Sequence, residues 1–226
     1  NFDHFLASKF STVKRYGGEG VEAAMAFYWQ TFSECANNGI KEVFLTIAHR
    51  GRLNLLAVLL EFPLEEMFRK MKGLPEFPPG VKGLGDVLSH LTNSIDLKFD
   101  DAQKSPSLHV SMLPNPSHLE AENPVAAGKT RGRMQSLGVG DYDEVGKSTG
   151  NEILCFQIHG DAAFNGQGVV AETLAFSRSP HFSTNGTLHL ILNNQIGYTT
   201  ETSGLSGHWA RAAACPIIHV NGEYPE

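Results

Sequence analysis

The apolar positions of this chain follow two spacings in turn. Short runs rich in β-branched and aromatic residues are typical of buried strands, and they alternate with segments whose apolar residues recur every three or four positions, as on one face of a helix. The predicted strands are 42–47, 107–113, 152–160, 187–194 and 215–222. The predicted helices are 21–36, 63–71 and 168–179, with a turn entering a helix at 48–60 and a helix, or a loop and a helix, at 119–135. Because strands alternate with helices, we predict an α/β fold with a parallel sheet covered by helices.

Two stretches between these elements lack either spacing. Residues 73–85 are dominated by glycine and proline, and residues 138–150 are polar and rich in glycine. Both compositions are typical of surface loops, which predicts that neither stretch belongs to the core.

Composition limits the classes of function. The 226 residues are enough for one domain of ordinary core size or slightly more, and 41% hydrophobic with 19% charged residues is a globular composition. The 24 acidic residues outnumber the 18 basic ones, and the net charge of −6 argues against nucleic acid as a partner. No apolar run approaches the roughly 20 residues of a membrane span. We therefore expect neither a nucleic-acid partner nor a membrane partner.

The three cysteines, Cys35, Cys155 and Cys215, are odd in number and widely separated. This usage predicts reduced thiols in the core of a cytosolic or organelle-matrix protein, not a disulfide framework. The chain opens with NFDHFLASKF, without a methionine or a signal peptide. We expect a piece of a longer protein whose targeting information lies elsewhere.

Polar residues follow four of the predicted strands at the point where each strand ends. They are 49–52, 115–118, 159–161 and 193–194. Parallel sheets bind ligands in the crevice outside the carboxyl ends of their strands. The pattern therefore predicts a ligand site at this edge of the sheet.

Two of these polar residues have oxygen atoms that suit a hard cation. Asp161 and Asn194 are 33 positions apart (194 − 161), which is enough for one strand–helix–strand crossover, so the two oxygens are expected to meet at adjacent strand ends. Carboxylate and amide oxygens, completed by phosphate oxygens and water, are the ligands that Mg²⁺ prefers. Arg52, near a predicted helix start, is expected to bind phosphate together with backbone N–H groups.

Each of these residues also has a purely structural interpretation. Asp161 and the paired asparagines Asn193 and Asn194 are frequent helix caps and turn formers. Singly, His49 and His159 are more often hydrogen-bonded structural residues than catalytic ones, and so is His118. The coincidence of polar groups at four successive predicted strand ends favours a ligand site.

Six motifs in the chain resemble those of a known family. The sequence Gly160-Asp161-Ala162, followed after 30 residues (163–192) by Asn193-Asn194, resembles the thiamine diphosphate motif. AHRGRLNLL and NPSHLEAENPVAAGKTRGR resemble the thiamine-dependent first component of the 2-oxoglutarate dehydrogenase family. ASKFSTVKRYGGEG, FPLEEMFRKMKGLPEFP and GDVLSHLTNSIDL are most similar to its 2-oxoadipate branch, with KRYGGEG standing where 2-oxoglutarate enzymes have phenylalanine, serine and leucine. The resemblance covers nearly the whole chain, but only the diphosphate-binding part of a much longer family protein.

The resemblance implies a set of site residues. Asp161 and Asn194 would bind Mg²⁺ through their side chains and Ile196 through its carbonyl. Thiamine diphosphate would be held by Arg52 and by the backbone after Asp161, at Ala162 and Ala163. The catalytic residues would be His49 and His118, which face the reacting centre, and the substrate pocket would contain Tyr16, His49, Ser117 and His118, with Tyr16 near the distal carboxylate.

The resemblance also implies an activity and partners. The expected reaction is thiamine-dependent oxidative decarboxylation of a dicarboxylic 2-oxo acid, preferably 2-oxoadipate, with acyl transfer to a lipoyl group. The expected partners are the dihydrolipoyl acyltransferase and dihydrolipoamide dehydrogenase components, and the full-length form is expected to be a homodimer in the mitochondrial matrix, or in the cytoplasm of a bacterium. Two alternatives stay open: the 2-oxoglutarate dehydrogenase first component, and a non-catalytic truncated homologue that acts as a binding module.

Departures from the family pattern carry further expectations. Residues 1–226 would be the diphosphate-binding domain alone, and the second, pyrimidine-binding domain with its activating glutamate would be absent, so this part alone should be inactive. Residues 201–214 are shorter than the family segment at this point and share little with it. Glu122 stands where an aliphatic residue is expected.

Overall fold

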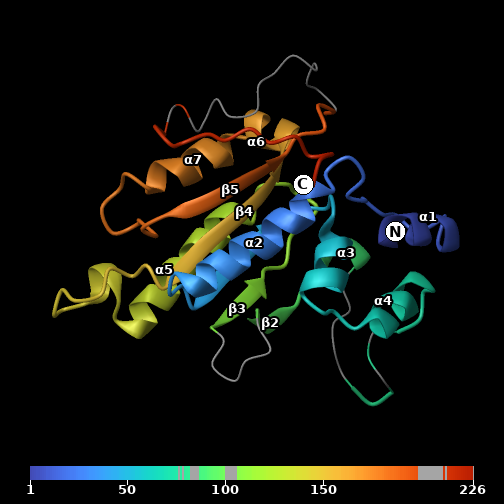
Figure 1. Ribbon diagram of the computed structural model, residues 1–226, viewed down its shortest axis with the longest axis horizontal. Coiled ribbons are helices and arrows are strands. Elements are labelled where there is room, and N and C mark those ends of the chain that lie inside the picture. The colour runs from blue at the N-terminus through green and yellow to red at the C-terminus, as the bar shows by residue number, and fades with distance from the viewer. Residues whose placement is uncertain are drawn as a thin grey trace.

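The computed structural model shows one sheet with helices on both of its faces (Figure 1). It describes residues 1–75, 77, 79–81, 87–99, 106–197, 211 and 213–225. Within these ranges, no helix combines the length and apolar character needed to cross a lipid bilayer.

The sheet has five strands in the order β2-β3-β1-β4-β5. Their bounds are β1 Glu42–Ile47, β2 Ser94–Lys98, β3 Ser107–Met112, β4 Ile153–Gly160 and β5 Thr187–Leu192. β1 runs parallel to both β3 and β4, and β4 runs parallel to β5. β2 pairs with β3 in the antiparallel direction at one edge. The predicted α/β fold is confirmed, with a mostly parallel sheet instead of a wholly parallel one.

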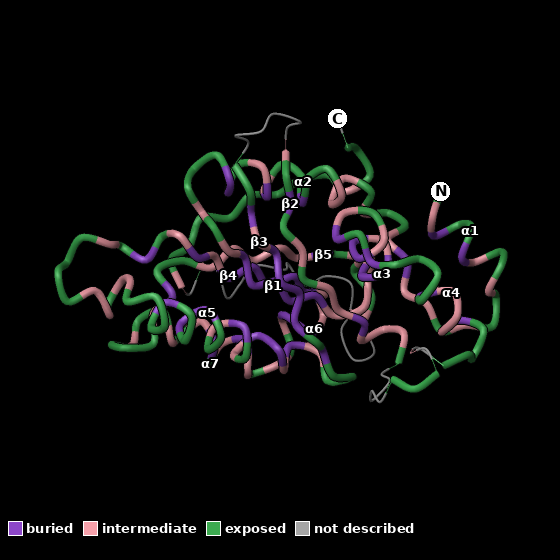
Figure 2. The backbone as a smooth tube through the Cα atoms, turned by 90° about the horizontal axis from the view of Figure 1, so that it is seen from below, coloured by how far each residue is buried: buried purple, intermediate pink, exposed green. Residues whose placement is uncertain are grey.

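The helices form two layers. Their bounds are α1 Phe2–Lys9, α2 Ala23–Asn37, α3 Arg52–Asn54, α4 Leu64–Met71, α5 Asn123–Leu137, α6 Asp161–Gly166 and α7 Gly168–Phe176. A π-helical turn at Leu55–Leu59 continues α3, and 3₁₀ turns occur at Leu88–His90 and Gly140–Tyr142. α2 covers one face of the sheet, and α5 and α7 cover the other (Figure 2).

Side-chain alternation along β1 explains these layers. Val43, Leu45 and Ile47 are buried in the large cluster that includes Phe32 of α2. Phe44, which points to the opposite face, packs with Met134 of α5 in a second cluster. Because both faces of the sheet are covered, the sequence of β1 is apolar at nearly every position, as is usual for buried parallel strands.

The predicted helices at 21–36, 63–71, 119–135 and 168–179 correspond to α2, α4, α5 and α7. The helix expected after residue 48 is present as α3 and its π-helical turn. The described parts of the two predicted loops, 73–85 and 138–150, contain no helix or strand apart from the 3₁₀ turn at Gly140–Tyr142. The analysis of the sequence did not identify α1, α6 or the edge strand β2.

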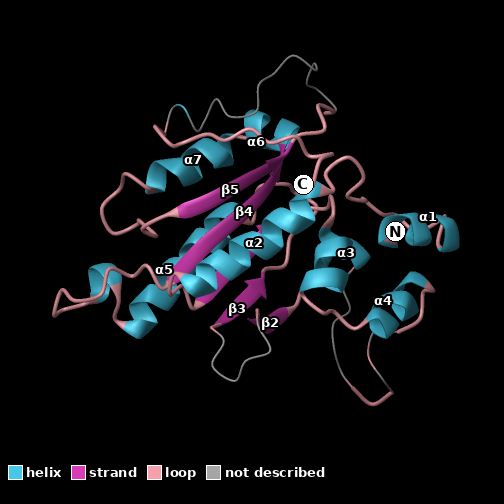
Figure 3. Ribbon diagram, in the orientation of Figure 1, coloured by secondary structure: helices cyan, strands magenta, loops and turns pink. Residues whose placement is uncertain are grey.

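The prediction of a strand at 215–222 is wrong. Its residues form neither helix nor strand, and the segment ends beside the start of α2 (Figure 3), where the Ala23 N–H donates to the carbonyl of Gly222. Ile218 and Val220 are 86% and 73% exposed, so the apolar pattern that suggested a strand is not buried in the described structure. Cys215 in this segment is exposed, whereas Cys35 and Cys155 are buried free thiols as predicted.

Candidate active site

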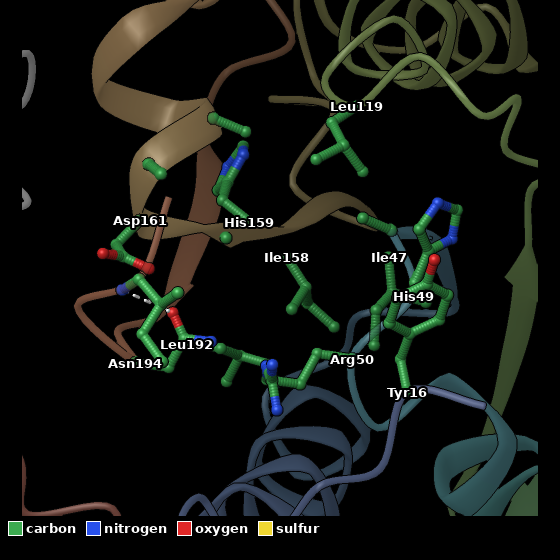
Figure 4. Close-up of a pocket in the computed structure, with 15 residues that line it drawn as sticks. Tyr16, Ile47, His49, Arg50, Leu119, Ile158, His159, Asp161, Leu192 and Asn194 are labelled. Carbon is green, nitrogen blue, oxygen red and sulfur yellow. Dashed lines mark hydrogen bonds between the residues drawn. The ribbon is translucent and has the colours of Figure 1, made fainter. Parts of the chain in front are cut away.

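A pocket lies at the point of the sheet where the chain changes the side on which it adds strands. The chain continues from β1 to the β2–β3 side of the sheet and then returns to β4 on the other side of β1. The connections that follow the carboxyl ends of β1 and β4 therefore leave in opposite directions. Open α/β sheets form their binding crevices at such a point. The pocket has a volume of about 170 Å³ (Figure 4). Its wall is formed by residues 47–50, from the end of β1 onward, and 158–163, from the end of β4 into α6, together with Tyr16, Leu119, Leu192, Asn194 and Ile196.

Asp161 and Asn194 lie at the same end of this pocket. Asp161 is the first residue of α6, directly after β4, and its side chain is buried. Asn194 follows β5, and the pairing of Gly160 with Leu192 brings the ends of the two strands together. Figure 4 shows the carboxylate and the amide near each other at the pocket wall. The expected meeting of these two residues at adjacent strand ends is therefore present.

The oxygen donors at this end fit a hard divalent cation. They comprise the Asp161 carboxylate, the Asn194 amide oxygen and the backbone carbonyl of Ile196, which are the types of ligand that Mg²⁺ prefers. The Asn194 Oδ1 accepts the N–H of Ile196 at 3.1 Å, so this oxygen must share or exchange that contact in order to bind a cation. A Cβ added to Gly160 would meet no atom within 4 Å, which leaves open space beside the carboxylate.

Ala162 and Ala163 also line the pocket. They lie in the first turn of α6, where backbone N–H groups have no intrahelical acceptor. Their methyl side chains leave the backbone accessible to a ligand. The expected arrangement of Asp161, two alanines and Asn194 along one wall is therefore present, although the roles of these residues stay predictions.

Arg52 occupies a different position from the expected one. Its side chain is completely buried, and its guanidinium donates to the carbonyls of Ile47, Leu113 and Leu91 at 2.5, 3.0 and 2.9 Å. A buried guanidinium needs such partners, and the carbonyls at the ends of β1 and β3 need donors. Arg52 does not line the pocket, and this arrangement does not present its charge to a phosphate.

The arginine that does line the pocket is Arg50. Its NH1 donates to the carbonyl of Gly17 at 3.3 Å, which leaves part of the guanidinium available for other partners. Gly51, between the two arginines, has a left-handed φ of 70°, and the side chains of Arg50 and Arg52 on either side of it point to different parts of the structure. Sequence reasoning recognised Arg50 only as a member of the polar run 49–52.

His49 stands at the end of the pocket opposite to Asp161 (Figure 4). Its ring stacks on that of Tyr16, with 5.0 Å between centroids and 24° between planes, and also with that of His90, with 6.1 Å between centroids. The Nδ1 atom is 3.1 Å from the Nδ2 atom of Asn115. Burial lowers the pKa of His49, and the charges of His90, Arg52 and Lys14 lower it further. The environment therefore favours a neutral imidazole.

Ser117 and His118 are not brought into the pocket. Both side chains are exposed in the loop between β3 and α5, and Leu119 is the residue of this loop that lines the pocket. The expected pairing of His49 with His118 across one site is absent from this arrangement, so the roles of Ser117 and His118 stay predictions.

A chain of hydrogen-bonded ionisable groups leads away from the pocket wall at His159. The His159 Nδ1 is 2.5 Å from the Glu120 Oε2, and the His159 Nε2 is 2.9 Å from the Nδ1 of His189. Burial is the main cause that lowers the pKa of His189 to about 3. Glu120 has a φ of 71°, which is unusual for a residue with a side chain. Both ring nitrogens of His159 are hydrogen-bonded, which is consistent with its structural interpretation, and that role stays a prediction. Glu120 and His189 were not recognised from the sequence.

Glu122 lies on the same loop as Glu120 and is also buried. Its Oε2 atom has no hydrogen-bond partner among the described residues. Burial raises the pKa of Glu122 to about 7, and the nearby charge of Glu120 contributes. The carboxyl group that stands in place of the expected aliphatic residue therefore favours its protonated form.

The loop that carries Tyr16 is held by a carboxylate from α1. Asp3 accepts a hydrogen bond from the side chain of Arg15 at 3.0 Å and another from the N–H of Gly18 at 2.9 Å. Arg15 directly precedes Tyr16, and Gly18 follows it by two residues. Gly18 lines a second cavity of about 370 Å³, which shares Leu192 with the first pocket. Gly18 therefore borders this second cavity, whereas the space beside Gly17 is occupied by the side chains of Glu19 and Arg15.

Residues 41–226 match a family model described as the dehydrogenase E1 component. The whole chain is 54% identical to the 2-oxoadipate dehydrogenase complex component E1 of Xenopus laevis and 55% identical to that of Homo sapiens, over 25% of each relative. It is 42% identical to the 2-oxoglutarate dehydrogenase E1 component of Brucella ovis, over 23% of that protein. The chain thus spans about a quarter of the length of these relatives. The resemblance found in the motifs, with greater similarity to the 2-oxoadipate branch, is confirmed, and the chain belongs to the dehydrogenase E1 component family.

Proposed function

We propose that this chain is the diphosphate-binding domain, residues 1–226, of the first component of a thiamine-dependent 2-oxo acid dehydrogenase. The observation that carries the proposal is the convergence of Asp161 and Asn194 at one pocket wall, with Ile196 beside them, at the switch point of the sheet. Oxygen donors in this arrangement are suited to Mg²⁺ bound to a diphosphate.

Each part of the pocket has a proposed role. Asp161, Asn194 and the Ile196 carbonyl hold Mg²⁺, and the backbone of Ala162 and Ala163 holds the diphosphate. Thiamine diphosphate, when bound, supplies the electron sink that decarboxylation of a 2-oxo acid requires. Arg50 adds positive charge at the pocket wall, in the role first expected of Arg52.

The opposite end of the pocket is proposed to bind the substrate. His49 orients the 2-oxo acid near the reacting carbon, and Tyr16 donates from its phenol to the distal carboxylate. Ser117 and His118 are proposed to contribute to the substrate site from the loop between β3 and α5. The activating glutamate is proposed to come from a second domain of the longer protein, so that the domain alone is inactive.

We propose 2-oxoadipate as the preferred substrate. The greater identity to relatives named for 2-oxoadipate than to the relative named for 2-oxoglutarate supports this choice. The absence of side chains at Gly17 and Gly18, near Tyr16, is proposed to favour the longer acid, although one methylene discriminates by only about 1–3 kcal/mol. The 2-oxoglutarate enzyme is the second candidate because its E1 component is a relative at 42% identity.

The partners follow from this function. We propose acyl transfer to a lipoyl group of the dihydrolipoyl acyltransferase component, with dihydrolipoamide dehydrogenase as the third component and a homodimeric full-length enzyme. The corresponding location is the mitochondrial matrix, or the cytoplasm in a bacterium.

The direct test is titration calorimetry of the full-length protein with thiamine diphosphate and Mg²⁺. Asp161→Asn removes the carboxylate at nearly unchanged volume and is expected to abolish binding that depends on Mg²⁺. Asp96→Asn makes the same change on the exposed edge strand β2, and it is the matched control. The proposal fails if the Asp161 variant is folded by circular dichroism and still binds the cofactor as tightly as the control.

A further inference from the structure

Asn115 connects the end of β3 to the end of β1 at the pocket. Its side chain is 3% exposed. The Nδ2 atom donates to the carbonyl of Ala48 at 3.1 Å and lies 3.1 Å from the Nδ1 of His49. A third contact, to the Pro116 carbonyl, is longer at 3.5 Å. The two hydrogens of the amide group therefore have two closer acceptors, one of which is the ring nitrogen of His49.

The Ala48 carbonyl decides how this amide is oriented. A carbonyl oxygen only accepts hydrogen bonds, so the edge of Asn115 that faces it must be the NH₂ group and not the oxygen. The same NH₂ group faces the His49 Nδ1, which must then accept as well. In a neutral imidazole, one nitrogen accepts and the other carries the proton, so the proton of His49 is on Nε2.

Burial and the neighbouring charges act in the same direction, whereas a hydrogen bond to the Ala48 backbone opposes them by raising the pKa of His49. The ring stacks with those of Tyr16 and His90, and the cations that lower its pKa include Arg52 and Lys14. No carboxylate is among the described groups that shift its pKa. A proton on Nδ1 would face the Asn115 NH₂ group, and an imidazolium would also face these positive charges.

We propose that Asn115 is a positioning residue that keeps His49 neutral with its ring proton on Nε2. This inference rests on the proposed function, because it assigns the chemistry of His49 in that site. With Nδ1 occupied by Asn115, Nε2–H is the polar atom that the ring can present to a ligand. His49 then acts as a hydrogen-bond donor to the 2-oxo acid, and accepting a proton at Nε2 would first require its own proton to leave.

The test is ¹⁵N nuclear magnetic resonance of the histidine rings in the 226-residue chain, without cofactor or substrate. The His49 signals are assigned by their loss in His49→Gln. The expected result for the wild type is an unprotonated Nδ1 and a protonated Nε2. Asn115→Asp replaces the donor by an acceptor and should transfer the proton to Nδ1 and raise the pH at which His49 titrates. Asn115→Ala should leave a mixture of the two tautomers.

Asn93→Asp is the matched control, since the Asn93 amide donates to the carbonyl of Leu60. It should leave the His49 signals unchanged. In the full-length enzyme, Asn115→Ala is expected to lower kcat roughly 2- to 10-fold, the effect of one lost hydrogen bond, with unchanged cofactor affinity. A wild-type His49 with its proton on Nδ1, or an Asn115→Ala spectrum identical to that of the wild type, would overturn the inference. Because no cofactor is present in the resonance experiment, that outcome is separate from a failure of cofactor binding.

Discussion

The imidazole Nδ1 of His159, at the end of β4, lies 2.5 Å from the carboxylate of Glu120, in the loop before α5. Both side chains are at most 2% exposed. Asn123 donates to the same Glu120 oxygen at 2.6 Å. This buried pair therefore attaches the loop that carries His118 to the central part of the sheet.

Removing one partner of this pair should destabilise the fold. Glu120→Ala leaves the His159 nitrogen without its acceptor in a buried position, and we expect the free energy of unfolding to fall by about 3–5 kcal/mol. Urea denaturation at pH 7 measures the difference. Glu144→Ala, which changes an exposed glutamate, is the control. A loss below about 1 kcal/mol for Glu120→Ala would show that the pair does not hold the loop.

Glu122 should make the stability of the protein depend on pH. Its pKa is about 7 in the folded state against an ordinary value of 4.5, so folding favours the protonated carboxyl. A raised pKa contributes stability that is complete below pH 4.5 and is lost as the pH rises through 7. The shift of about 2.5 pKa units (7 − 4.5) corresponds to about 3 kcal/mol.

Urea denaturation of the wild type and of Glu122→Gln at pH 5 and pH 8 tests this dependence. The neutral amide cannot ionise, so the variant should be more stable than the wild type at pH 8 and should lose less stability between the two pH values. Parallel losses in the two proteins would mean that Glu122 does not titrate in this interval.

Arg50 and Arg52 should respond differently to substitution. Arg52→Lys keeps the charge but cannot maintain three hydrogen bonds to the carbonyls of Ile47, Leu91 and Leu113, and we expect a loss of about 2–5 kcal/mol in the free energy of unfolding. Arg50→Lys should change stability by less than about 0.5 kcal/mol. In the full-length protein, Arg50→Ala should weaken thiamine diphosphate binding. If calorimetry instead shows that Arg52→Lys alone weakens binding, with stability unchanged, then Arg52 is the phosphate residue after all.

The glycines beside Tyr16 should influence the choice of substrate. A Cβ on Gly18 would lie 3.6 Å from Asn54 and Gly51, an ordinary contact, whereas a Cβ on Gly17 would require the flexible ends of Glu19 and Arg15 to move, including the Arg15 nitrogen that binds Asp3. Gly17→Ser with Gly18→Leu should therefore be tolerated and should shift the ratio of kcat/KM toward 2-oxoglutarate by roughly 10- to 200-fold.

The control for this double variant is Gly128→Ser on α5, where an added Cβ meets no atom within 4 Å. Both variants are assayed with 2-oxoadipate and 2-oxoglutarate in the complete dehydrogenase assembly. A wild type that already prefers 2-oxoglutarate, or a ratio that the double variant does not change, would favour the 2-oxoglutarate enzyme.

The sequence by itself determined the α/β fold and one side of the pocket. Runs such as 42–47 are apolar on both faces, and only a sheet covered on both faces buries such a run. The 33 positions between Asp161 and Asn194 accommodate one crossover, and consecutive parallel strands joined in this way usually lie side by side. Local patterning and short connections are sufficient for these inferences because each depends on neighbours in the chain.

Only the tertiary structure decided which polar side chains face the pocket. Arg50 and Arg52 are two positions apart, yet the left-handed turn at Gly51 directs one to the pocket and the other to three buried carbonyls. Glu120 and His159 are 39 positions apart and meet because α5 packs on β4. The segment 215–222 alternates like a strand but has no strand partner in the described structure. Contacts of this kind depend on the packing of distant elements, so a residue pattern along the chain does not contain them.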